Sequence, residues 1–123
     1  MRTEARITLL ASMLHWSIVP GMIFIEDHAF LKRRKGLLDD AELFELLEWL
    51  ARNPAGGKVI PGSGGLRKVS WAAKGHGKRG GVRVIYFWWL ADDRILLLDV
   101  YAKADQENLS GAEIEKLRQK VIE

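Results

Sequence analysis

The stretch that most constrains the fold is a pair of strand-like runs joined by a loop rich in glycine and positive charge. Residues 66–71 and 82–86 carry the alternating, β-branched and aromatic side chains that are typical of strands. The connecting residues 74–81 include four glycines, two lysines, one arginine and one histidine. This pattern predicts a β-hairpin that presents cations to a polyanion.

The positive charge around this hairpin has no acidic counterpart nearby in the sequence. The window 55–91 contains no Asp or Glu, although the formal net charge of the whole chain is only +3. Its positive residues are Lys58, Arg67, Lys68, Lys74, Lys78, Arg79 and Arg83. Arg83 lies in an otherwise apolar run, where a cation is costly unless it meets an anion, and phosphate is a natural partner for arginine.

Length and composition favour a single globular domain. A chain of 123 residues can bury a hydrophobic core, and 48% of its residues are hydrophobic. The absence of cysteine excludes disulfides and thiolate metal sites, and it fits a cytoplasmic protein. The three histidines show no metal-ligand spacing with the carboxylates, so we expect no metal and no cofactor.

The first 21 residues differ from the rest of the chain. Arg2 and Arg6 precede an apolar run over 7–19, which is too short to span a bilayer, and no membrane partner is expected. We assign 1–21 to an N-terminal extension upstream of a possible start at Met22, and 22–123 to the folded domain. A short packed helix and a targeting segment are alternatives for the extension.

The remaining patterns predict an α+β fold with a largely antiparallel four-stranded sheet, an N-terminal helical hairpin and a C-terminal helix, the helices packing against one face. Strands are expected over 22–25, 66–73, 82–90 and 94–103, and 58–60 is either a short strand or an extended lead-in. Helices are expected over 28–35, from Asp39 to about residue 52, and after Ser110; both Asp39-x-x-Glu42 and Ser110-x-x-Glu113 fit N-terminal caps.

Period-two alternation assigns side chains to the two faces of the sheet. In the strand 66–73, Lys68 lies on the face opposite to Arg67, while 82–90 is apolar on both faces apart from Arg83. In the last strand, alternation places Ile95, Leu97, Asp99, Tyr101 and Lys103 on one face.

Two nucleotide-binding motifs are excluded by their context. Gly75-x-Gly77-x-x-Gly80 matches the dinucleotide fingerprint in letters, but a strand follows it where a helix is required. Gly77-Lys78 is followed by Arg79 instead of Ser or Thr, so it is not a phosphate-binding P-loop.

Together, three stretches resemble the HigB branch of the RelE-like toxins of type II toxin–antitoxin systems. They are Val59-Ile60-Pro61-Gly62-Ser63-Gly64-Gly65-Leu66-Arg67-Lys68-Val69, Gly77-Lys78-Arg79-Gly80-Gly81-Val82-Arg83-Val84-Ile85-Tyr86 and Val100-Tyr101-Ala102-Lys103. The resemblance covers residues from Met22 to the C-terminus.

This resemblance implies a compact RelE-like ribonuclease that enters the ribosomal A site and cuts translated mRNA. The ribose 2′-OH would attack the adjacent phosphate without a metal. The implied partners are the ribosome, mRNA and a cognate antitoxin, expected to be a helix-turn-helix DNA-binding protein. The alternative is a non-catalytic RNA- or ribosome-binding module with the same fold.

Site residues follow from the same resemblance. Arg83 would stabilise the phosphate, Lys68 would act as stabiliser or base, Tyr101 would stack on a base or share proton transfer, and Lys103 would add a cation at the end of the last strand. The expected RNA-binding residues are Arg67, Lys74, His76, Lys78 and Arg79. The chain departs from some RelE-like toxins at Ser70 and Ala104, where those carry cations, and it has no tyrosine in the final helix.

Overall fold

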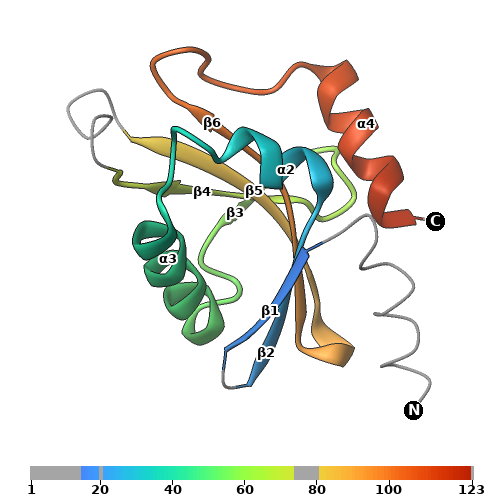
Figure 1. Ribbon diagram of the computed structural model, residues 1–123. Helices are drawn as coiled ribbons and strands as arrows, with labels where there is room; N and C mark the ends of the chain where they lie inside the picture. Colours follow the sequence, from blue (N-terminus) through green and yellow to red (C-terminus); the bar gives the residue numbers. More distant parts are fainter. Residues whose placement is uncertain (1–14, 20, 74–80, 123) are drawn as a thin grey trace.

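The computed structural model describes residues 15–19, 21–73 and 81–122, which form a curved sheet with helices on both sides (Figure 1). The strands are β1 (His15–Val19), β2 (Met22–Glu26), β3 (Lys58–Val59), β4 (Arg67–Trp71), β5 (Val82–Trp89) and β6 (Arg94–Ala102). The helices are α2 (His28–Arg33), α3 (Asp40–Arg52) and α4 (Gly111–Ile122), and a short 3-10 turn, η2 (Leu90–Asp92), joins β5 to β6.

The α+β class is confirmed, but the sheet differs from the expected four-stranded antiparallel one. It has six strands in the order β1-β2-β6-β5-β4-β3, and β2 pairs with β6 in parallel. The parallel pair arises because the chain from β2 crosses the molecule through α2, α3 and the β4–β5 hairpin before it returns as β6. Of the two additional strands, β3 is only two residues long.

The other additional strand, β1, comes from the segment that the sequence analysis assigned to an N-terminal extension. It pairs antiparallel with β2 along the full length of that strand, from His15 opposite Glu26 to Val19 opposite Met22. The division of the chain at residue 22 stays a prediction.

The helices begin at the capping residues that the sequence predicted. At α3, Asp39 Oδ1 accepts from the Glu42 N–H at 2.7 Å, and Glu42 Oε1 accepts from the Asp39 N–H at 2.9 Å. Ser110 and Glu113 form the same reciprocal pair before α4, at 3.1 and 2.8 Å. Within the described part of the chain, no helix is both long and apolar enough to cross a membrane.

The expectation that the helices cover one face of the sheet is wrong, because the sheet has a hydrophobic core on each side. The leucine stripe of α3 packs with Val84 and Tyr86 of β5, and Phe30 of α2 joins that core. Leu117 of α4 packs on the opposite face with Ile85. As predicted, β5 is therefore buried on both sides, and Figure 1 shows the strands passing between α3 and α4.

A β-bulge in β6 overturns the simple alternation expected for that strand. Tyr86 pairs with Leu97, yet the preceding residue Ile85 pairs with Asp99, so Leu98 is an extra residue in the ladder. Leu97 packs in the α3-side core, whereas Leu98 packs in the α4-side core. Because a bulge shifts the phase of alternation by one residue, Asp99 and Tyr101 project towards the α4 side, whereas Val100 between them packs in the α3-side core.

Tyr86 fixes the connection between α3 and β3 from inside the core. Its hydroxyl donates to Pro54 O at 2.8 Å and accepts from the Gly57 N–H at 2.8 Å. Burial raises the pKa of this hydroxyl, so it stays a proton donor at neutral pH. A Cβ on Gly57 would lie only 2.8 Å from the Tyr86 ring, so this close approach requires glycine.

Removing this hydroxyl should therefore destabilise the fold. Tyr86→Phe leaves two backbone groups without their partner and is expected to lower the free energy of unfolding by about 1–3 kcal/mol, measured by urea denaturation. Tyr101→Phe is the matched control, because that ring is also buried while its hydroxyl, within the described residues, makes one long hydrogen bond of 3.4 Å. Equal losses for the two variants would contradict this assignment.

Candidate active site and nucleic-acid interface

Two of the cations with predicted catalytic roles lie on one face of the sheet, the face covered by α4. In the β4–β5 ladder, Lys68 is opposite Ile85, and Arg83 is opposite Ser70. Directly opposed residues of an antiparallel pair project to the same side, so Lys68 and Arg83 are diagonal neighbours on that side. Ile85 belongs to the α4-side core, which identifies the face. We call Lys68, Arg83 and Lys103 the cationic cluster.

Lys103 extends this cluster at the end of β6. Tyr101 is opposite Arg83 in the β5–β6 ladder, and pairing continues past the strand because the Lys103 N–H donates to Gly81 O at 3.1 Å. Lys103 is the first residue of the turn that follows β6, so its backbone is held beside the Arg83 end of β5. Without the bulge, alternation from the α3-facing residue Leu97 would have sent Tyr101 to the other face.

Lys68 is oriented by a residue from the connection between β6 and α4. Its Nζ donates to Asn108 Oδ1 at 2.7 Å, and its side chain is half-buried. The ammonium retains further donor capacity, because it has three N–H bonds. Lys68 is thus held at a defined place while still able to meet an anion.

Tyr101 is the cross-strand neighbour of Arg83 in the β5–β6 ladder. Tyr101 is 2% exposed and its hydroxyl donates to Glu107 O at 3.4 Å, whereas Arg83 is half-buried and donates to Val82 O at 3.4 Å. Burial raises the pKa of Tyr101, an effect that the nearby Arg83 charge opposes. Because its ring is enclosed, Tyr101 offers no open face for a base in this conformation, so the geometry favours positioning of Arg83 over stacking.

Asp99 is a buried carboxylate next to the cationic cluster. Its Oδ1 accepts from Arg33 Nη1 of α2 at 2.8 Å and from the Val100 N–H at 2.9 Å, and the residue is 5% exposed. Burial is the largest influence and raises the pKa of Asp99. The charges of Arg33 and Lys120 oppose this shift, and Glu113 adds to it.

This raised pKa gives a pH-dependence of stability with a definite sign. Between the ordinary pKa of 3.8 and the raised value, the folded state binds more protons at Asp99 than the unfolded state does. Asp99 therefore makes stability fall as pH rises through that window. Urea denaturation between pH 4 and 7 should show Asp99→Asn gaining stability relative to wild type as pH rises; a difference that stayed constant or reversed would contradict the shift.

The predicted RNA-binding residues divide into two groups. Arg67 lies on the opposite face from Lys68, where its Nη1 donates to Gly57 O at 2.8 Å and to Ala55 O at 3.3 Å. The structure therefore does not bring it together with the cationic cluster. The other four residues lie outside the described part of the chain: Lys74, His76, Lys78 and Arg79.

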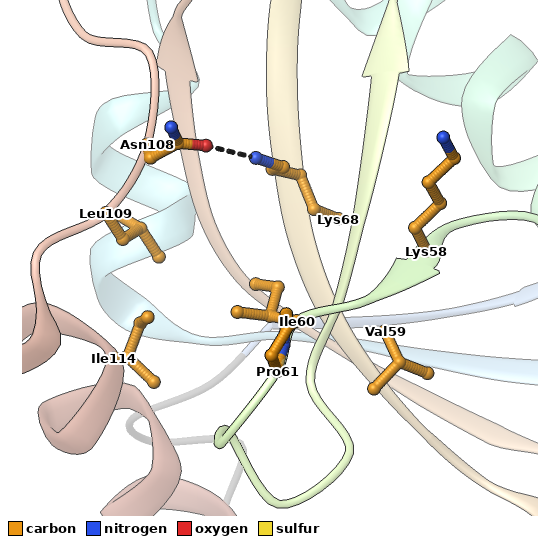
Figure 2. Close-up of a pocket in the computed structure, with 8 residues that line it drawn as sticks. All are labelled: Lys58, Val59, Ile60, Pro61, Lys68, Asn108, Leu109 and Ile114. Carbon is orange, nitrogen blue, oxygen red and sulfur yellow. Dashed lines mark hydrogen bonds between the residues drawn. The ribbon is translucent and has the colours of Figure 1, made fainter.

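A pocket of about 410 Å³ opens next to Lys68, between the β3–β4 edge and the start of α4 (Figure 2). Lys58 of β3, directly opposite Lys68, also lines it. The remaining lining residues are Asn108 and an apolar group formed by Val59, Ile60, Pro61, Leu109 and Ile114.

Three residues around this site were not assigned to it from the sequence. The sequence did contain an indication for Lys58, because it is one of the positive residues in the window 55–91, which has no Asp or Glu. Asn108 and Arg33 had none, because each meets its partner across a long stretch of sequence: 40 residues separate Lys68 from Asn108, and α2 reaches β6 only through the tertiary fold.

The chain was compared with protein-family models and with solved structures. No protein-family model matches the chain. Among solved structures, the chain is similar to the Escherichia coli toxin RelE, seen as a double arginine-to-alanine mutant in the free state. The two share 14% sequence identity over 81% of this chain and 96% of the other, with a TM-score of 0.52. The chain therefore has a RelE-like toxin fold, as its sequence resemblance implied.

Proposed function

We propose that this protein is a toxin of a type II toxin–antitoxin system that cuts ribosome-bound mRNA. The observation that carries the proposal is the placement of Lys68 and Arg83 as diagonal neighbours on one face of a RelE-like fold, with Lys103 in the turn after β6, where its backbone N–H bonds to Gly81 O. Cations gathered from neighbouring strands suit a single phosphate better than separate surface contacts do.

The reaction is an internal transesterification. The ribose 2′-oxygen bonds to the adjacent phosphorus while the bond from phosphorus to the 5′-oxygen breaks, which leaves a 2′,3′-cyclic phosphate and a 5′-hydroxyl. One proton leaves the 2′-oxygen and one reaches the departing 5′-oxygen. The protein must align the nucleotide and stabilise the extra negative charge on the phosphate oxygens.

Arg83 has the side chain best suited to the phosphate oxygens. Its planar guanidinium can donate two parallel hydrogen bonds to them, and Tyr101, directly opposite it in the β5–β6 ladder, would restrict its position. Lys68 supplies a second positive charge or acts in proton transfer, and Lys103 supplies a third charge. Tyr101 is in this scheme a positioning residue.

The ribosome supplies the substrate and a cognate antitoxin supplies control. Induced expression without antitoxin should stop growth and produce cleaved mRNA whose 5′ ends map within translated codons. Coexpression of the antitoxin should prevent both effects. A chain that is harmless on induction and leaves mRNA intact, yet still binds RNA, would instead be a non-catalytic RNA- or ribosome-binding module.

A further inference from the structure

The pocket beside Lys68 has two chemically different ends. In Figure 2, Lys58 and Lys68 lie on the side of the pocket away from Ile60, Pro61 and Ile114; Lys68 extends towards Asn108, and Lys58 extends separately across the β4 ribbon from it. We infer that this pocket binds one nucleotide of a single-stranded RNA, with a phosphate at the lysine end and the base against the apolar end.

The charge at the lysine end favours an anion. Lys58 and Lys68 are directly opposite each other in the β3–β4 ladder, an arrangement in which like charges repel. Among the described residues, no carboxylate lines the pocket, and the side chain that accepts from Lys68 is the neutral amide of Asn108. A phosphate bound by either ammonium group would reduce this repulsion.

The apolar end suits a flat ring. Val59 lines this end and is 50% exposed, and Ile60, Pro61, Leu109 and Ile114 complete its apolar lining. A pocket of about 410 Å³ is within the range that binds small organic groups. The Asn108 amide at the rim carries both donors and acceptors, so it can meet the polar edge of a base.

Lys68 belongs both to this pocket and to the cationic cluster, which links the two sites. A nucleotide in the pocket and the phosphate at Arg83 would therefore be close neighbours along one strand. The inference rests on the proposed function in that its ligand is RNA. It goes further by assigning Lys58, Val59 and Asn108 to recognition of a nucleotide outside the reacting phosphate.

The test uses a fluorescein-labelled five-nucleotide RNA without ribosomes, with binding followed by fluorescence anisotropy at several KCl concentrations. Lys58→Ala removes a phosphate contact, so it should weaken binding and reduce the slope of log K against log salt concentration by about 0.7. Lys35→Ala is the matched control; Lys35 is exposed after α2 and does not line the pocket, so affinity and slope should not change.

The base contact is tested separately with the same RNA made abasic. Wild type should bind the intact strand about tenfold more tightly than the abasic one. Val59→Ser should reduce this preference about threefold and leave the salt slope unchanged, because it removes apolar contact without altering charge. Both Lys58 and Val59 are exposed, and thermal melts will establish that the variants are folded.

The outcomes separate this inference from the proposed function. The pocket assignment is wrong if wild type does not bind the RNA, or if Lys58→Ala and Val59→Ser bind both strands as wild type does; in either case, mRNA cleavage on ribosomes would leave the proposed function standing. Base-dependent binding that both variants weaken would support the pocket even if no mRNA were cut.

Discussion

Arg83→Ala is expected to lower the rate of ribosome-dependent mRNA cleavage by about 10²–10³-fold and to abolish growth arrest on induction. In the proposed reaction, the Arg83 guanidinium stabilises charge that develops on the phosphate, and loss of one such donor typically has an effect of this size. Single-turnover cleavage of mRNA on purified ribosomes measures the loss directly.

Two further variants separate the effect of the Arg83 guanidinium from a general loss of positive charge. Arg52→Ala removes the same charge from the exposed last residue of α3, so it should cleave at the wild-type rate. Arg83→Lys keeps the charge but loses the bidentate geometry, so it should fall between wild type and Arg83→Ala. If folded Arg83→Ala cleaved as fast as Arg52→Ala, Arg83 would have no part in the chemistry.

The second large effect is on stability: Gly81→Ala is expected to destabilise the protein by about 2–5 kcal/mol. Gly81 has φ +70°, which costs a residue with a side chain about 1–2 kcal/mol. A Cβ there would also lie 2.3 Å from Trp71 O, which is a backbone atom, so no side-chain rotation can relieve the clash. The backbone of β4 or β5 would have to shift, at a further cost of about 1–3 kcal/mol.

Other glycines of the chain separate these two contributions. Gly62 has φ +71° with open space around its Cβ position, so Gly62→Ala should show the conformational cost alone. Gly111 has open space without a positive φ, so Gly111→Ala should be neutral or stabilising by up to about 1 kcal/mol. Urea denaturation should rank the losses Gly81 above Gly62 above Gly111, and any other order would contradict the structure.

Local chemistry made much of the fold predictable. The caps at Asp39 and Ser110 are satisfied by groups three residues away, so sequence spacing alone reveals them. The two-sided burial of β5 follows from its apolar run, which Arg83 alone interrupts. These features depend on contacts within one element or on a period of two.

The parts that sequence reasoning missed depend on contacts between distant elements. Leu98 has no sequence feature that marks it as an extra residue, because a bulge is defined by the partner strand. The parallel β2–β6 pair and the placement of α4 opposite α3 are properties of chain topology.

The candidate site shows the same division. The sequence brought Lys68 and Arg83 together through a family resemblance, whereas their shared face follows from the β4–β5 register, which alternation within either strand does not give. That Tyr101 also lies there depends on the bulge, since uninterrupted alternation would have kept it with Leu97 on the α3 side. The sequence therefore grouped Tyr101 with the predicted site residues, but the regular alternation that it assumed for β6 is wrong because of the bulge.

The chemistry of the cleaved ends tests the central claim most directly. Purified ribosomes carrying a labelled mRNA are incubated with the folded protein, and both new termini are identified. Attack by the ribose 2′-oxygen predicts a 5′-hydroxyl on one fragment and a 2′,3′-cyclic phosphate, or its opened form, on the other. Intact mRNA, or fragments that begin with a 5′-phosphate, would contradict the proposal that Lys68, Arg83 and Lys103 act together on one ribose-phosphate unit.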